Sequence, residues 1–131
     1  MTRNAIASVL VVLVLAAIAA AQGGSPLSYA TDIEPIFTKE CGDCHSADNP
    51  KKGLDLSQGH GFAALLDRPS QMEPPAVLVK AGDQAGSYLW AKLSHSQAKG
   101  KGMPRTMFSD RKLGEAELTI VGRWIGEGAK P

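Results

Sequence analysis

Two cysteines, the only ones in the 131-residue chain, stand three positions apart, and a histidine directly follows the second one. The segment reads Cys41-Gly42-Asp43-Cys44-His45. This C-x-x-C-H spacing is that of the attachment motif of c-type haem. Two thiols on one helical turn can each add to one vinyl group of the haem, and the next residue places an imidazole beneath the iron. We therefore predict covalent links from Cys41 and Cys44 and iron ligation by the Nε2 atom of His45, whose other ring nitrogen donates to a backbone carbonyl.

Two other uses of the motif agree less well with its surroundings. A redox-active disulfide of thioredoxin type normally opens a helix after a strand, whereas this motif closes a predicted helix and no βαβ pattern follows. A zinc module usually supplies a second Cys or His pair at similar spacing. Only the scattered His60 and His95 remain for that purpose.

The second axial ligand of the iron would decide what the haem does. Met103 is the leading candidate, because it lies 58 residues after His45 in a glycine-rich loop that Pro104 stiffens. A thioether bound to iron together with histidine raises the reduction potential and suits electron transfer. The alternatives are Met107, His95, Met72, His60 and an open sixth position, which would indicate gas binding or peroxide chemistry.

Several other segments extend the pattern around the motif. They are residues 29–37 (YATDIEPIF), 53–56 (GLDL), 87–93 (SYLWAKL), the pair Met103-Pro104 and residues 118–129. Together with C-x-x-C-H they resemble a small class I cytochrome c, and more narrowly the c-type modules of planctomycete-type domains. The resemblance implies an all-α cytochrome c fold, with three to four short helices and long loops wrapped around one covalently attached haem. It also implies that the N- and C-terminal helices cross beside the haem.

The chain divides into three parts. Residues 1–21 have a basic start at Arg3, an apolar run and a small-residue end, which is typical of a secretory signal peptide. An uncleaved membrane anchor is the alternative. Residues 22–28 form a polar linker, and residues 29–131 form the cytochrome c domain. Either interpretation of the leader places this domain outside the cytoplasm, in the periplasm or an equivalent compartment.

Capping signals and apolar spacing predict where the helices lie. Thr31 and Glu34 form a capping box for the first helix. Asp83 caps a later helix over about 85–95, and a last helix runs over 115–127. Residues 61–66 predict another short helix, and residues 53–56 and 77–79 are extended. Gly122 and Gly126 lower the stability of the last helix by about 1 kcal/mol each relative to alanine, unless they permit a close helix crossing.

Some apolar residues are expected near the haem. Leu54 and Leu56 are expected to touch the porphyrin. Trp124 is expected to pack against Ile33 and Phe37, with a hydrogen bond from its indole N–H to a haem propionate as the alternative. The chain has 14 Gly and 8 Pro and little apolar bulk outside the leader, so the haem would supply much of the core. We therefore expect the chain without haem to be unfolded or molten.

Charge and chemistry together predict the class of function. A net charge of +1 argues against a protein that coats nucleic acid. Five basic residues and one acid, Asp110, flank the proposed ligand loop, where they either steer an acidic redox partner or form a solvated surface. The basic residues are Lys99, Lys101, Arg105, Arg111 and Lys112. We predict a one-electron carrier rather than an enzyme. A haem sensor or peroxidase-like protein, or a haem subunit docked on a larger oxidoreductase, is the alternative.

Overall fold

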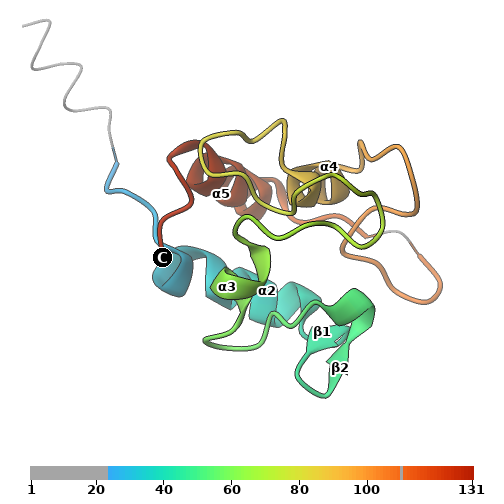
Figure 1. Ribbon diagram of the computed structural model, residues 1–131. Coiled ribbons are helices and arrows are strands. Elements are labelled where there is room, and N and C mark those ends of the chain that lie inside the picture. The colour runs from blue at the N-terminus through green and yellow to red at the C-terminus, as the bar shows by residue number, and fades with distance from the viewer. Residues whose placement is uncertain (1–23, 110) are drawn as a thin grey trace, which may run out of the picture.

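A computed structural model describes residues 24–109 and 111–131 (Figure 1). The predicted signal peptide at 1–21 lies outside the described residues, as does the start of the linker. The described chain contains η1 (Tyr29–Ile33), α2 (Glu34–Cys41), β1 (His45–Ser46), β2 (Asn49–Pro50), η2 (Lys51–Gly53), α3 (Gly61–Leu65), α4 (Tyr88–Ser94) and α5 (Glu115–Gly126). Within these residues no helix is long and apolar enough to cross a membrane.

The prediction of an all-α cytochrome c fold is wrong. Directly after the C-x-x-C-H motif the chain forms an antiparallel hairpin, in which His45 pairs with Pro50 and Ser46 with Asn49. The hairpin forms because the side chain of Asn49 donates to the carbonyl oxygen of Asp43 at 3.0 Å, which closes the turn back toward the motif. His45 therefore begins a strand instead of continuing the helix that carries Cys41. The described fold is mixed, with short helices, one small sheet and long irregular connections.

The first helical segment begins earlier than predicted. Ser28, not Thr31, is the N-cap, since its hydroxyl accepts a hydrogen bond from the backbone N–H of Thr31. The carboxylate of Asp32 accepts from the N–H of Ser28 at 2.8 Å, so Ser28 and Asp32 form the reciprocal arrangement that was predicted for Thr31 and Glu34. Glu34 instead accepts a hydrogen bond from the backbone of Gly59. The helical segment that leads to the C-x-x-C-H motif therefore begins at Tyr29 and continues through η1 and α2 to Cys41.

The remaining predicted helices are present, and one has a different start. Residues 61–66 and 115–127 correspond to α3 and α5, so these predictions are confirmed. The helix expected over about 85–95 begins only at Tyr88, because Asp83 accepts from the N–H of Gly86 and closes a separate turn. α4 ends where His95 adopts a left-handed conformation with φ of 60°. The predicted extended piece 77–79 is also confirmed, since Val77 and Val79 form isolated bridges to neighbouring segments.

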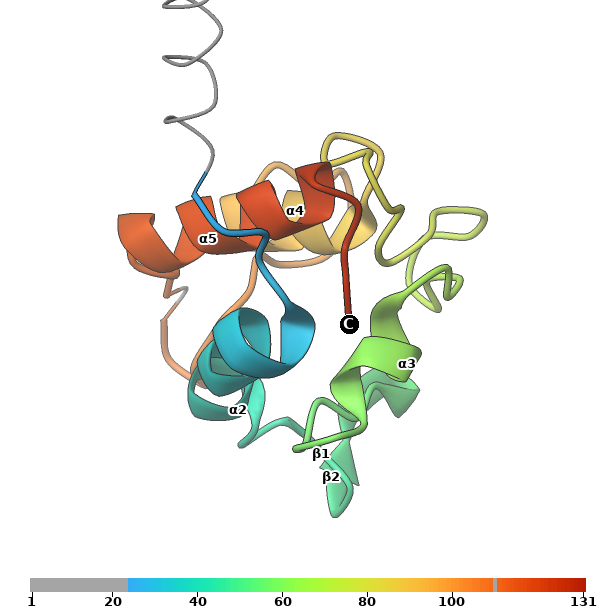
Figure 2. The same cartoon turned by 90° about the vertical axis from the view of Figure 1, so that its left-hand side faces the viewer.

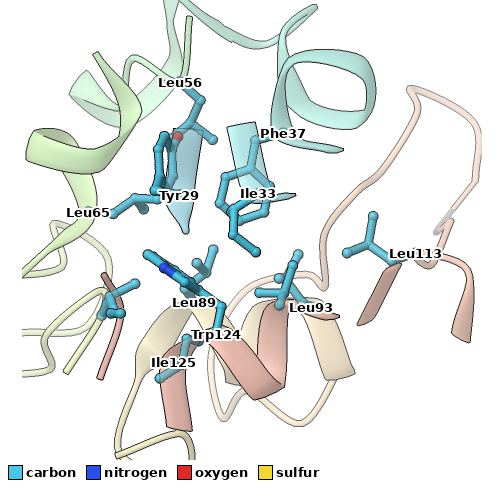
Figure 3. Close-up of a cluster of buried hydrophobic side chains, with 13 residues drawn as sticks. Tyr29, Ile33, Phe37, Leu56, Leu65, Leu89, Leu93, Leu113, Trp124 and Ile125 are labelled. Atoms are coloured by element: carbon cyan, nitrogen blue, oxygen red, sulfur yellow. The ribbon is translucent and has the colours of Figure 1, made fainter. Parts of the chain in front are cut away.

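The core lies between two helical layers. α4 and α5 lie side by side, and η1 with α2 packs beneath them (Figure 2). Tyr29 of η1 contacts the rings of Phe37 and Trp124, and all three side chains are buried (Figure 3). The indole N–H of Trp124 donates to the carbonyl oxygen of Lys130 at 2.8 Å. Trp124 therefore packs in one buried cluster with Ile33 and Phe37, as expected, and its N–H is already bonded within the chain.

The two glycines of α5 differ in their surroundings. A Cβ atom on Gly122 would lie 2.8 Å from the ring of Trp90 in α4, whereas one on Gly126 would meet nothing within 4 Å. Gly122 thus permits the close approach of α4 and α5, and Gly126 does not contribute to it. The contact also fixes the place of α4, which carries Leu89 and Leu93 in the wall of a cavity.

Candidate functional site

A cavity of about 460 Å³ brings together three of the residues that the sequence singled out: Cys41, His45 and Met103. A volume of this size is in the range of pockets that hold small molecules and cofactors. Much of the apolar part of its wall consists of leucines from three separate segments. They are Leu54, Leu56, Leu78, Leu89 and Leu93. Leu56, Leu89 and Leu93 also belong to the buried core (Figure 3), so the wall of the cavity and the core share these side chains.

The two thiols of the motif lie in different environments. Cys41 ends α2 on the cavity wall, and burial raises the pKa of its thiol to about 12, so the thiol is protonated at neutral pH. Cys44 follows in a turn that is closed by a hydrogen bond from its N–H to the carbonyl oxygen of Cys41. Its Sγ lies 3.4 Å from the ammonium of Lys51, and Cys44 is not among the described residues that line the cavity. Both cysteines are free thiols in the described structure.

His45 is held in one tautomer by a backbone group. Its Nδ1 lies 3.3 Å from the carbonyl oxygen of Leu54, and because a carbonyl can only accept, Nδ1 must carry the proton. Burial lowers the pKa of His45, so the ring is neutral at pH 7 and its Nε2 keeps a lone pair for a metal. The sequence predicted a carbonyl partner for this ring, and the structure identifies it as that of Leu54.

Only some of the candidate second ligands lie at the cavity. Met103 is half-buried on the wall, and Met72 also lines it with 39% of its surface exposed. Met107 is 87% exposed on the same loop as Met103 and lies outside the described lining. His95 bonds through Nε2 to the carbonyl oxygen of Met103, and His60 belongs to an exposed turn with Ser57. Among the described residues, the structure thus places Met103 and Met72 at the cavity, and Met107, His95 and His60 away from it.

The charged part of the cavity wall is basic, and four of its five basic residues are exposed to solvent. Within the described part of the chain, basic side chains but no carboxylates line it. The basic residues are Lys52, Arg68, Lys92, Lys101 and Arg105. Two of these, Lys101 and Arg105, were predicted as part of a basic group flanking the ligand loop. Arg111 instead forms an ion pair with Glu40 of α2, and Asp110 lies outside the described residues.

Sequence reasoning missed part of the wall. Lys92 and Arg68 were not singled out, although Lys92 stands one turn after Tyr88 on the helix face that carries Leu89 and Leu93. Reading that face as a cavity wall would have included the lysine. The hydroxyl of Tyr88 is buried and has no hydrogen-bond partner in the described structure. The wall therefore offers an orphaned phenol close to Lys92, whose ammonium lies 5.3 Å from the centre of the Tyr88 ring, and these groups suit a carboxylate of a bound group.

These residues fit a haem. The cavity wall combines a thiol, a neutral imidazole and a thioether with leucine side chains and basic side chains. Each of these groups has a counterpart on a haem. A thiol can react with a vinyl group, the imidazole and the thioether can bind the iron, the leucines can pack against the flat apolar ring, and the cations can pair with the two carboxylates. In the described residues no cluster of three or more His, Cys, Asp or Glu side chains forms a separate metal-binding group. No protein-family model, curated protein or solved structure shows a significant match to the chain.

Proposed function

We propose that this chain is an exported c-type haem protein with one covalently attached haem, and that it carries single electrons between redox partner proteins. When bound, the haem would supply an iron that takes up one electron from a donor protein and passes it to an acceptor protein, so that no bond in a substrate changes. Cys41 and Cys44 would hold the haem through thioether links, and His45 and Met103 would be the ligands of its iron.

The observation that carries this proposal is the convergence of His45 and Met103 on one cavity. The two residues are far apart in sequence, and each belongs to a different segment of the chain. The hydrogen bond to Leu54 holds the His45 ring as a neutral ligand. The burial of Met103 gives its thioether a place on the wall that the exposed Met107 lacks.

The other residues of the wall have supporting roles. The leucines exclude water from the iron environment, which is one of the factors that set the potential of a haem. The basic side chains of the wall balance the negative charge of the haem carboxylates. Lys101 and Arg105 belong to the same loop as Met103, so a partner with an acidic surface would dock close to the opening of the cavity.

An absorption spectrum of the denatured protein in alkaline pyridine tests the attachment. After maturation in a host that attaches haem c, we expect a spectrum of haem with two thioether links, retained through acid–acetone extraction. The Cys44→Ala variant should show the shifted spectrum of a single link. Colourless protein with two reactive thiols would refute the proposal.

A matched pair of methionine variants tests the second ligand. In ferric wild-type protein we expect low-spin iron with the weak red band of sulfur bound to iron. Met103→Leu should abolish this band and lower the reduction potential, whereas Met107→Leu should leave both unchanged. High-spin iron that binds carbon monoxide without displacing a ligand in the wild type would contradict the electron-carrier function and favour a sensor or peroxidase-like protein.

A further inference from the structure

The backbone on both sides of the Met103 side chain is bonded to the C-terminal end of α4. The N–H of Met103 donates to the carbonyl oxygen of Lys92 at 2.8 Å. The carbonyl oxygen of Met103 accepts from Nε2 of His95 at 3.3 Å. With the Gln97 amide oriented to satisfy both of its neighbours, its oxygen accepts from the N–H of Gly102 at 2.8 Å and its nitrogen donates to Ala91 at 3.1 Å.

Lys92 fixes the preceding part of the same loop. Its ammonium donates to the carbonyl oxygen of Lys101 at 2.8 Å and approaches that of Lys99 at 3.4 Å. Burial lowers the pKa of Lys92, but the group is partly exposed and faces these carbonyls. One turn of α4 and the residues that follow it therefore hold the backbone of residues 99–103, which we call the methionine loop.

His95 reaches the loop because of two conformational features. Its left-handed backbone ends α4 and turns the chain toward residues 96–103. Its ring then lies directly over Gly102, where a Cβ atom would come within 2.4 Å of the imidazole. Any residue larger than glycine at position 102 would therefore displace the His95 ring, which explains why a glycine precedes the methionine.

We propose that His95 is a positioning residue for the second axial ligand: together with Lys92 and Gln97 it fixes the backbone of Met103 so that the thioether stays at the iron. This inference rests on the proposed function. It assigns His95 a purpose other than ligation, and it explains how a methionine in a glycine-rich loop is kept in place. Fixing a loop before it binds reduces the entropy lost when the bond to iron forms.

Imidazole binding to the ferric holoprotein tests the proposal, because imidazole must displace Met103 from the iron. Gln places an amide nitrogen near the position of Nε2 of histidine, whereas Asn is too short to reach and tolerates the left-handed backbone. We expect His95→Asn to bind imidazole about fivefold more tightly than wild type, as follows from the loss of one hydrogen bond. His95→Gln should stay within about twofold of wild type, and His60→Asn, on an exposed turn, should not differ from it.

Gly102→Ala is the second variant, since it displaces the imidazole without removing it. We expect an increase in imidazole affinity similar to that of His95→Asn, together with faster hydrogen exchange of the Met103 amide. Equal affinities of wild type and His95→Asn would overturn the positioning role. Equal effects of His95→Asn and His95→Gln would also overturn it, because the hydrogen bond would then not matter.

The failure of this inference differs from the failure of the proposed function. If Met103→Leu leaves the red band and the imidazole affinity unchanged, Met103 is not the ligand and the proposed ligation is wrong. If Met103→Leu removes the band while His95→Asn behaves as wild type, only the positioning role is wrong. The haem content of each variant, measured in pyridine, shows whether it has matured normally.

Discussion

The segment from Cys41 to Leu56 and the methionine loop reach the same cavity by different means. In the first, the chemistry and its support are contiguous: the hairpin after the motif returns the chain so that the carbonyl of Leu54 meets the ring of His45. The methionine loop depends on a different element, since α4 holds it through Lys92 and His95. A site residue that carries its own support can be recognised from spacing, whereas one held by another helix needs the fold.

The largest effect should come from the motif itself. In the double variant Cys41→Ala/Cys44→Ala, no haem can be attached, and the cavity keeps an apolar wall without an occupant. A cavity of about 460 Å³ in so small a domain leaves many core contacts unmade. We expect no cooperative thermal transition and no near-ultraviolet circular dichroism.

The matched control for this variant is Cys44→Ala, which keeps Cys41 and His45 for attachment. It should retain haem and a cooperative transition. Cooperative unfolding of the haem-free double variant would contradict the view that haem forms part of the core.

A change in the contact between α4 and α5 should also affect the methionine loop, because α4 holds that loop. Gly122→Ala places a methyl group against the ring of Trp90, so we expect a loss of about 1–3 kcal/mol in the free energy of unfolding. Gly126→Ala meets nothing and should raise stability by up to about 1 kcal/mol, because alanine favours helix. Denaturant titration of the two holoproteins measures both. An unchanged stability of Gly122→Ala would show that α4 can move away without cost.

Charge gives the next distinction between the two regions. Lys99 and Lys101 are exposed on the methionine loop, and Lys130, which serves as the control, is exposed on the segment that follows α5. We expect Lys99→Glu/Lys101→Glu to slow electron transfer to an acidic partner about threefold at low salt, and Lys130→Glu to have little effect. Stopped-flow rates at several ionic strengths check this. A wild-type rate that does not fall with added salt would exclude steering by the loop.

The smallest effect concerns the link between α2 and the residues that follow the loop. Lys39 and Arg111 hold the pKa of Glu40 below its usual range, through the hydrogen bond from Lys39 first and the charge of Arg111 next. A carboxyl with a lowered pKa contributes stability above its ordinary pKa, and this is lost as pH falls through the lower value of the folded state.

Arg111→Gln should therefore destabilise the holoprotein by about 0.5 kcal/mol at pH 7, because Arg111 is half-exposed and solvent screens its charge. The difference from wild type should disappear as pH falls through the lowered pKa of Glu40, where its carboxylate becomes protonated in the folded state. Thermal unfolding at pH 7 and at pH 3 measures it. A difference that persists at the lower pH would assign the effect to packing of the arginine instead of its charge.

Sequence reasoning predicted those features that depend on nearby residues. α5 was predicted correctly because the spacing of its apolar residues and the glycine that follows it at position 128 are both local signals. The predicted start of α4 was wrong, because Asp83 can either cap a helix or close a turn. The hydroxyl of Ser87 favours the turn, since it accepts from the N–H of Lys80 and donates to the carbonyl oxygen of Asp83. The hairpin after the motif was missed because strands of two residues leave no periodicity to detect.

The site shows the same division. Met103 was selected from its loop and its distance from the motif, and the structure places it at the cavity. The carbonyl partner of His45 could not be named, because it depends on a reversal of the chain between residues 46 and 54. The function of His95 could not be found either, since the signal is a hydrogen bond to the backbone, which leaves no pattern in side-chain types.

One carbonyl oxygen after α5 serves two donors that lie far apart in the sequence. The carbonyl oxygen of Lys130 accepts from the N–H of Tyr29 at 2.9 Å and from the indole of Trp124 at 2.8 Å, so the backbone of the first helical segment is fastened to the segment that follows α5. A chain cut before Lys130 would leave both donors without this acceptor, and a buried donor without a partner is costly. The two residues after Ala129 are therefore part of the folded domain and not a dispensable tail.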